Sequence, residues 1–370
     1  MNRLVRPLLL ACILMAGIVM HAGVIAAPIK IVDVRGRTIT LSQPTHKLAI
    51  DDGRFLVALS LLLPDPVKVL AAWPHDINRL GKRTYALYVK KFPAIKQVPR
   101  VASSAGNFNM EALLAADPDV AVFSLGHGPT SAQTAMLKSV GIQTVFIDFA
   151  RHPFKNQDHS LRILGKLTGS LDQAKRFIAF RKQRMDAIRQ KVATLAPSQR
   201  PGVFLEAHAG ISNDCCYSPG KGNVGAYIDF VGGHNIGAEV IPGASGKLSM
   251  EYILSRNPKV YIATGGPQLA KTGGLVLGRG FSKQQARASL KRITERHGIA
   301  HMGAVRRGDV HGLAHQLLKS PLDIVAIEVL AKWIHPQLFA GLDPAETLAT
   351  INREFLAVPY TGTFWVSLKR

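Results

Sequence analysis

Two short stretches of the sequence follow one pattern, and together they decide the expected fold. MEALLAADPDVAVFS covers residues 110–124, and MEYILSRNPKVYIAT covers residues 250–264, with Met, Glu, Pro and Val in register at an offset of 140 residues. In each copy a residue that favours helix N-caps, Asn109 or Ser249, precedes a short apolar helix. A proline ends that helix, because the residue before proline avoids the helical conformation. The apolar run that follows is typical of a buried strand.

Each copy continues in the same way. A helical pattern over residues 132–140 and a strand over residues 144–147 follow the first copy, and a helix over residues 284–296 and a strand over residues 310–313 follow the second. Strand, helix and strand at this spacing indicate a parallel sheet. We therefore expect an α/β protein with two Rossmann-like lobes, one in each half of the chain.

A long helix is expected between the two copies. Ser170 and Gln173 form a capping-box pattern, and apolar residues then recur at spacings of three and four up to Pro197, except where Arg181 interrupts. Such a helix would be about 38 Å long, enough to bridge two lobes. The expected organisation is a signal peptide at residues 1–26, an N-terminal α/β lobe at 27–168, a linking helix at 169–197 and a C-terminal α/β lobe at 198–370.

The N-terminus and the charge indicate where the protein works. Arg3 and Arg6 precede an apolar run over residues 8–20 and a stretch of small residues, which is the order of a secretory signal peptide; we expect cleavage after Ala26. An uncleaved membrane anchor is the alternative. The mature chain keeps 44 basic and 24 acidic residues, so an anionic partner is expected. Export from the cytoplasm and the scattered positions of the basic residues both argue against nucleic acid as this partner.

The sequence holds no convincing catalytic constellation, so we predict a protein that is not an enzyme and has no cofactor. Neither a nucleophile elbow, a phosphate-binding loop nor an HExxH motif occurs. The pairs His297/His301 and His311/His315 have a spacing that zinc sites use on helices. Each pair encloses a glycine, and the second begins in a strand-like stretch, so no metal site is predicted.

Further blocks occur in a characteristic order along the chain: Gly141-Ile142 before a strand, residues 232–236, residues 304–310, and Ser320-Pro321 with residues 325–339. The chain resembles the helix-hinged class of periplasmic substrate-binding proteins, which supply ABC importers with ferric siderophores, haem, cobalamin or metal ions, and the iron–siderophore branch most closely. The resemblance covers essentially the whole mature chain; it rests on residues 109–122, Gly141-Ile142, the long helix, residues 232–236, 249–260, 304–310 and Ser320-Pro321 with residues 325–339.

The resemblance implies a monomer in the periplasm that captures an Fe(III) chelate and delivers it to an inner-membrane ABC permease. Haem, cobalamin or a bare metal ion is the alternative cargo in the same fold. An exported metal-cofactor oxidoreductase component is the alternative from another functional class. Within this resemblance Glu111 and Glu251 match the positions that dock on permease arginines. A carboxylate in the first turn of a helix is also favoured by the helix dipole, by about 0.3–1 kcal/mol.

Ligand is expected in a cleft between the lobes, at the carboxyl ends of the strands. Arginine and aromatic side chains would suit a bulky, partly apolar and anionic chelate. The residues predicted to bind ligand are Arg54, Trp73, Ser104, Phe108, His127, Arg151, His208, Cys215, Cys216 and Tyr217. Cys215 and Cys216 are adjacent, and either two free thiols or a strained vicinal disulfide would fit an oxidising compartment.

Overall fold

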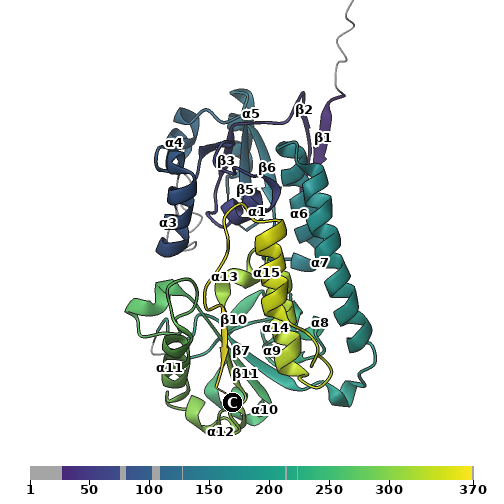
Figure 1. Ribbon diagram of the computed structural model, residues 1–370, viewed down its shortest axis with the longest axis vertical. Coiled ribbons are helices and arrows are strands. Elements are labelled where there is room, and N and C mark those ends of the chain that lie inside the picture. Colours follow the sequence, from purple (N-terminus) through teal and green to yellow (C-terminus); the bar gives the residue numbers. More distant parts are fainter. Residues whose placement is uncertain are drawn as a thin grey trace, which may run out of the picture.

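Two sheets, one in each half of the chain, form the framework of the molecule (Figure 1). The computed structural model describes residues 27–75, 81–101, 109–126, 128–212, 215–222 and 224–368. The expected signal peptide and the predicted ligand residues Ser104, Phe108 and His127 lie outside the described residues. Within the described part, no helix has the length and apolar character needed to cross a membrane.

The N-terminal lobe is built on a four-stranded parallel sheet in the order β4-β3-β5-β6. A separate antiparallel pair, β1–β2, lies at its edge. Its strands are β1 (Ile29–Val32), β2 (Thr38–Leu41), β3 (Leu48–Ile50), β4 (Leu70–Ala72), β5 (Val120–Ser124) and β6 (Gln143–Ile147). Its helices are α1 (Phe55–Leu62), α3 (Lys82–Lys91), η1 (Pro93–Lys96), α4 (Met110–Ala115), α5 (Ser131–Ser139) and α6 (Pro153–Leu167).

The C-terminal lobe contains a five-stranded sheet in the order β13-β12-β11-β7-β9, parallel except at the edge strand β13. A short antiparallel pair, β8–β10, lies beside it. The strands are β7 (Gly202–Glu206), β8 (Tyr217–Pro219), β9 (His234–Asn235), β10 (Ser245–Lys247), β11 (Val260–Gly265), β12 (Val310–Ala314) and β13 (Trp365–Ser367). The helices are η2 (Pro197–Gln199), α8 (Gly225–Phe230), α9 (Gly237–Val240), α10 (Met250–Arg256), η3 (Pro267–Lys271), α11 (Lys283–Thr294), η4 (Ile299–His301), α12 (Gly303–Arg306), α13 (His315–Leu318), α14 (Asp323–Ile334) and α15 (Pro344–Glu354).

The repeated pattern forms the same local structure in both lobes, as the sequence predicts. The Asn109 side chain accepts a hydrogen bond from the Ala112 N–H at 3.0 Å, and the Ser249 hydroxyl accepts one from the Tyr252 N–H at 3.2 Å, so each helix has its expected N-cap. After each helix a residue with positive φ, Asp117 or Asn257, stands directly before the proline. The buried strands β5 and β11 then begin.

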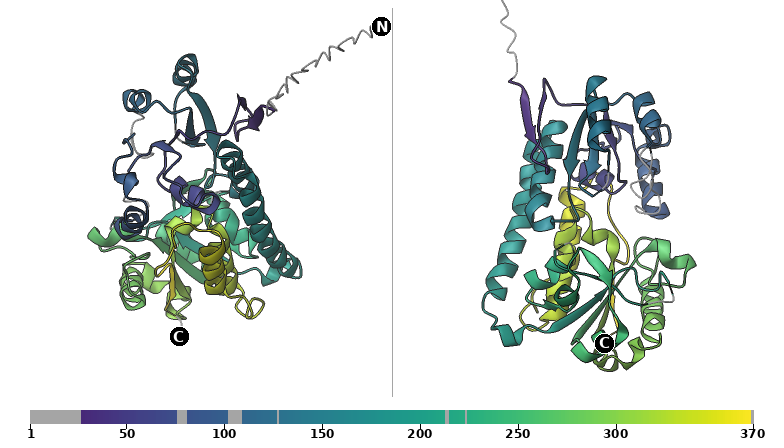
Figure 2. Two further views of the ribbon diagram at one scale, coloured as in Figure 1. Left: turned by 45° about the horizontal axis from the view of Figure 1, so that its top comes forward. Right: turned by 180° about the vertical axis from the view of Figure 1, so that it is seen from behind.

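Helix α7 (Leu171–Val192) runs along both lobes (Figure 2, right). Its 22 residues span about 33 Å, shorter than expected, because regular helix stops at Val192. The predicted cap at Ser170 does not form. The Ser170 hydroxyl instead lies 2.7 Å from the Thr168 hydroxyl, so it bonds to the end of α6 and caps no N–H of α7.

Arg181, which interrupts the apolar pattern of the linking helix, is the centre of a buried polar network. Its guanidinium donates to Asp323 on α14, with Nε–Oδ1 at 2.9 Å and Nη2–Oδ2 at 2.7 Å, and to Asp158 on α6 at 3.0 Å. Gln157 on α6 and Tyr227 on α8 also donate to Asp323. Arg181 and Asp323 are 2% and 0% exposed. The network therefore fastens elements of both lobes to the linking helix.

The C-terminal segment makes a second connection between the lobes. After α15 the chain returns to the N-terminal lobe, where the Ala357 N–H donates to the Ser60 carbonyl at 2.9 Å and Lys91 Nζ donates to the Ala357 carbonyl at 2.6 Å. Phe355 packs edge-on against Phe177 of α7, with ring centroids 5.2 Å apart. Figure 1 shows α15, in yellow, at the junction of the lobes. The linking helix is thus not the sole contact between them.

Replacing Arg181 with methionine should destabilise the protein strongly. Arg181→Met leaves the Asp323 carboxylate buried without its ionic partner, which should lower the free energy of unfolding by about 3–5 kcal/mol. Adding Asp323→Asn removes the stranded charge and should recover part of that loss. Urea denaturation would measure both. The control is Lys175→Met on the same helix, where an exposed pair with Asp172 is worth less than about 1 kcal/mol. Equal losses in Arg181→Met and the control would contradict the assigned role.

Candidate functional site

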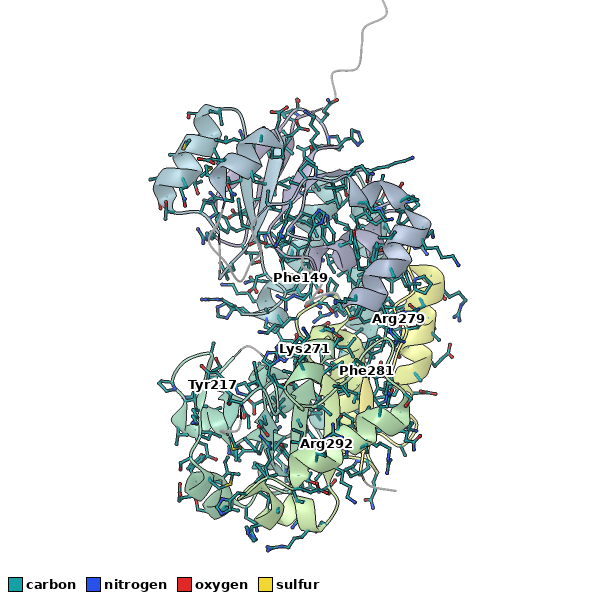
Figure 3. The ribbon with its side chains drawn as sticks, turned by 90° about the vertical axis from the view of Figure 1, so that its left-hand side faces the viewer. Phe149, Tyr217, Lys271, Arg279, Phe281 and Arg292 are labelled. Carbon is teal, nitrogen blue, oxygen red and sulfur yellow. A yellow bond between two sulfur atoms is a disulfide. The ribbon has the colours of Figure 1, made fainter. Side chains whose placement is uncertain are left out.

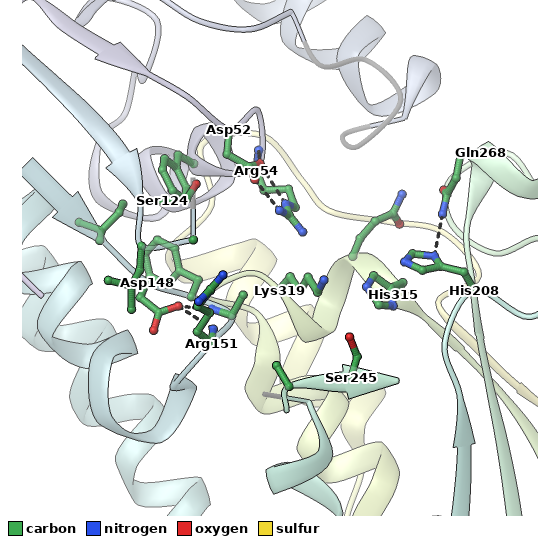
Figure 4. Close-up of a pocket in the computed structure, with 18 residues that line it drawn as sticks. Asp52, Arg54, Ser124, Asp148, Arg151, His208, Ser245, Gln268, His315 and Lys319 are labelled. Atoms are coloured by element: carbon green, nitrogen blue, oxygen red, sulfur yellow. Dashed lines mark hydrogen bonds and ion pairs between the residues drawn. The ribbon is translucent and has the colours of Figure 1, made fainter. Parts of the chain in front are cut away.

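A cavity of about 570 Å³ lies between the lobes and is called the cleft cavity here (Figure 4). Its walls come from loops that follow parallel strands, as expected for α/β sheets. On the N-terminal side it is lined by Asp52, Arg54, Phe55, Ser124, Leu125, Gly126, Ile147, Asp148, Phe149, Ala150 and Arg151. On the C-terminal side it is lined by His208, Ala244, Ser245, Gln268, His315, Gln316 and Lys319.

Arg54 is held in place by its neighbour Asp52, directly after β3. The Arg54 Nε donates to Asp52 Oδ1 at 2.9 Å, and a second bond joins Nη2 to Oδ2. Asp52 is 2% exposed, so the pair orients the guanidinium within the cavity wall. The carboxylate balances the charge of Arg54 while a ligand is absent.

Arg151 is presented by a loop that Asp148 organises, after β6. The Asp148 carboxylate accepts hydrogen bonds from the backbone N–H groups of Ala150, Arg151 and His152 at 2.7–2.9 Å, and from the Asn156 side chain at 2.8 Å. Its oxygens therefore face the backbone of their own loop. Arg151 itself is exposed in the cavity, and within the described part of the chain no hydrogen bond to its guanidinium is present.

Two histidines form the opposite wall. The rings of His208 and His315 lie 3.9 Å apart between centroids, and Gln268 Nε2 lies 3.5 Å from His208 Nδ1. Thr264 connects the two histidines. Its hydroxyl accepts a hydrogen bond from the backbone N–H of His208 at 2.9 Å and lies 3.1 Å from Nδ1 of the His315 ring. Lys319, after α13, adds a cation from this lobe. Among the described residues, no three His, Cys, Asp or Glu side chains are placed to hold a metal ion.

Asp51 lies directly after β3, is buried, and has an unusual environment. Burial, and secondarily the charge of Asp52, raises the pKa of its carboxyl to about 7. Its two oxygens accept hydrogen bonds from the Ser124 N–H and hydroxyl, both at 2.9 Å. These bonds fix the end of β5 relative to the end of β3, the two points from which Ser124 and Arg54 enter the cavity.

The structure brings three of the predicted ligand residues, Arg54, Arg151 and His208, into one cavity. Trp73 does not line it. Trp73 is 0% exposed, and its ring stacks on Tyr85 of α3 with 5.7 Å between centroids. The backbone of Trp73 pairs with the segment that contains Pro99 and Val101. Helix α3 and this segment therefore cover the end of β4. Trp73 is therefore a core residue of the N-terminal lobe in this structure.

The predicted residues of the loop before β8 also lie outside the cavity lining. The structure joins Cys215 and Cys216 by a disulfide, and Cys216 is buried. Tyr217 is 53% exposed and belongs to β8. Contact of these three residues with ligand stays a prediction.

The sequence reasoning missed His315, Gln316 and Lys319. The sequence did contain a signal for them, because they follow β12 just as Arg151 follows β6. Residues directly after the carboxyl end of a parallel strand are expected to line the ligand site. Gln268 had the same signal, because it follows β11. Ser245 had none, because it belongs to the β8–β10 pair, whose position depends on tertiary packing.

A family model for periplasmic binding proteins matches residues 59–317, well over half of the chain. This chain is a periplasmic binding protein. The family consists of proteins that bind ligands for transport, not enzymes with cofactors, which agrees with the predictions from the sequence. The oxidoreductase alternative is thereby set aside.

Solved structures that resemble this periplasmic binding protein share its two-lobed fold. A TroA-like periplasmic binding protein, FepB from Veillonella parvula, has a TM-score of 0.81 and 25% identity over 92% of this chain and 99% of its own. The molybdate-bound protein MolA from Haemophilus influenzae has a TM-score of 0.69 and 17% identity over 90% and 99% of the chains. The predicted fold class of two α/β lobes is confirmed.

A curated relative named cobalamin-binding protein, from Halobacterium salinarum, is 31% identical over 210 residues. That alignment covers 54% of each protein, so this chain spans about half the length of the curated relatives it matches.

Asp51 should make the stability of this binding protein depend on pH. Since folding raises the pKa of its carboxyl from 3.8 to about 7, the folded state holds a proton that the unfolded state releases. The favourable contribution is complete below about pH 4 and is lost as the pH rises through 7, a change of roughly 2–4 kcal/mol. Asp51→Asn can keep both bonds to Ser124, so its stability relative to wild type should increase from pH 5 to pH 8 in thermal unfolding.

The exposed carboxylate Asp172 on α7 supplies the matched control. Asp172→Asn should leave the difference from wild type constant over the same pH range. A constant difference for Asp51→Asn as well would show that Asp51 is not the titrating group.

Proposed function

We propose that this protein is the periplasmic solute-binding component of an ABC import system and that it captures a ferric siderophore or a similar anionic Fe(III) chelate. The observation that carries the proposal is the convergence of Arg54, Arg151 and Lys319, from both lobes, on the cleft cavity. The acids beside them are already engaged: Asp52 bonds to Arg54, and Asp148 accepts from three backbone N–H groups of its own loop and from the Asn156 side chain on α6. An anionic ligand would therefore meet charge-assisted donors and little carboxylate repulsion.

The size of the cavity fits the same cargo class. A volume of about 570 Å³ lies within the range of pockets that enclose ligands of several hundred daltons. Phe55, Phe149 and Leu125 add apolar surface to the cationic wall. A chelate that is bulky, partly apolar and negatively charged combines both requirements, whereas a bare metal ion would need a cluster of ligating side chains, and the described residues contain none.

Cobalamin is the second candidate, because a relative that is 31% identical over half of the chain is named a cobalamin-binding protein. Haem stays an alternative of the same fold. Ferric catecholate and ferric citrate complexes are anionic, so a cargo of that type would gain more from Arg151 than cobalamin would.

A titration panel tests the cargo. Intrinsic tryptophan fluorescence of the purified mature protein would be followed against ferric catecholate, ferric hydroxamate, ferric citrate, haem and cobalamin. An anionic ferric chelate should bind at one site, and Arg151→Gln should weaken it about 10–100-fold through loss of a charge-assisted hydrogen bond. Arg162→Gln, an exposed arginine on α6, is the control and should bind as wild type. Binding of cobalamin without any ferric chelate would favour the second candidate.

We also propose that Glu111 and Glu251 are the docking groups for the permease. Each is exposed in the first turn of the matching helix of its lobe, α4 or α10, and neither lines the cleft cavity. One carboxylate on each lobe would let a partner contact both lobes of the loaded protein. Export through a signal peptide cleaved after Ala26 belongs to the same proposal.

Charge reversal tests the docking. Glu111→Lys/Glu251→Lys should fold and bind ligand as wild type, losing only about 0.3–1 kcal/mol of helix-dipole stabilisation at each site. Like charges against a cationic permease surface cost several kcal/mol, so the variant should fail to stimulate the permease ATPase in proteoliposomes. The control is Glu346→Lys, an exposed glutamate in the first turn of α15. Normal stimulation by the folded double variant would contradict docking, and loss of ligand affinity would place the glutamates in the cleft.

A further inference from the structure

A second cavity, of about 460 Å³, adjoins the cleft cavity and is called the basic cavity here. The two share Gln268 and Gln316 as lining residues, so they meet at the junction of the lobes. The basic cavity is lined by Gly81, Lys82, Arg83 and Thr84 from the N-terminal lobe and by Pro267, Gln268, Ala270, Lys271, Arg279, Gly280, Phe281 and Gln316 from the C-terminal lobe. Figure 3 shows Lys271, Arg279 and Phe281 on the side of the C-terminal lobe that faces the other lobe.

Four cations surround this space, and none of the described residues that line it is an acid. Lys82 and Arg83 come from one lobe, and Lys271 and Arg279 from the other. Like charges gathered around one cavity repel each other, and the repulsion acts across the lobe junction. In the cleft cavity, by contrast, Arg54 has Asp52 beside it. Among the described residues that line the basic cavity there is no such carboxylate, so an anion would relieve the repulsion between these four cations.

The start of α3 points to the same conclusion. Lys82 and Arg83 occupy the first turn of this ten-residue helix, where the partial positive charge of the helix end disfavours cations. The first turn holds no acid, and the N-cap residue Gly81 supplies no side-chain cap. A helix N-terminus with two adjacent cations is suited to binding an oxyanion.

Two features of the C-terminal side bear on the shape and the chemistry of the basic cavity. Gly280 has a φ of +94°, a conformation that favours glycine, and the Arg83 side chain of the other lobe lies directly against it. The Arg279 Nε is buried and has no hydrogen-bond partner among the described residues, while its Nη2 donates to Thr361. A buried donor of this kind gains most from an added acceptor.

We propose that the basic cavity is an oxyanion site that binds a multiply charged phosphate or carboxylate group and thereby bridges the two lobes. The anion is either a pendant group of the cargo in the cleft cavity or a free anion bound alongside it. The inference deepens the proposed function by adding a charged subsite to the cleft, but its first test needs no chelate. Failure of the oxyanion-site inference can therefore be told from failure of the proposed transport of a ferric chelate.

Calorimetric titration of the purified protein with sodium pyrophosphate at low ionic strength is the direct test. Wild type should bind one pyrophosphate, and Arg83→Gln/Lys271→Gln, which removes one cation from each lobe, should weaken binding by at least about tenfold. The matched control is Lys90→Gln/Arg292→Gln. It removes an exposed cation from the same helix α3 and another from α11, which Figure 3 shows farther from the junction. The control should bind within about twofold of wild type.

Three results would overturn the inference: no binding by wild type, an equal loss in the control, or binding that persists in Arg83→Gln/Lys271→Gln and disappears in Arg151→Gln. The last would place pyrophosphate in the cleft cavity. The source of the anion follows from repeating a ferric citrate titration with millimolar phosphate present. Tighter binding of the chelate in wild type, but not in the double variant, identifies a free co-ligand. Weaker, competitive binding in wild type, but not in the double variant, identifies a group of the cargo. An effect of phosphate that is equal in both proteins, or absent from both, contradicts the oxyanion site.

Discussion

Arg181 carries its positive charge inside the protein, at the point where the linking helix meets both lobes. The groups around it must therefore supply hydrogen-bond and ionic partners for a buried guanidinium. Its guanidinium and the Asp323 carboxylate are almost completely removed from water, and a buried pair of this kind is tolerable only while its hydrogen bonds are satisfied. Those bonds come from α6, α7, α8 and α14 together. A large rotation of one lobe about α7 would break several of them at once, so the network favours one relative position of the lobes.

The fixed geometry explains why the cleft can be assembled from loops. In both lobes the carboxyl ends of parallel strands face the junction, and each contributes side chains whose orientation is set locally. Asp52 orients Arg54, Asp148 organises the turn that carries Arg151, and Thr264 connects His208 with His315. The acids of the site act as supports for these loops. What faces the ligand is therefore more basic than the number of carboxylates nearby would indicate.

Local patterns in the sequence predict most of this fold, because its repeated unit is set by local chemistry. Asn109 and Ser249 cap their helices, and Pro118 and Pro258 end them, through interactions within a few residues. Arg54 and Arg151 were predicted to lie in the cleft because strand ends are visible in the apolar pattern, and both line the cleft cavity, while their contact with ligand stays a prediction. Two other side chains are placed differently from what the sequence indicates. Whether Trp73 faces the cleft or the core depends on where α3 packs, and whether Ser170 caps α7 depends on competition from Thr168. Such choices between partners are decided by tertiary contacts that no local pattern records.

The return of the chain after α15 has a consequence for the order in which the molecule can be completed. Ala357 bonds to both Ser60 and Lys91, so residues close to the C-terminus finish a surface that belongs to the first third of the chain. Domains generally form in sequence order as a chain emerges. The N-terminal lobe can assemble early, but its contact with this segment must wait until almost every residue is available. The two lobes thus acquire their final relation only at the end of folding, and a chain that stops short of Ala357 would have two lobes without this closing contact.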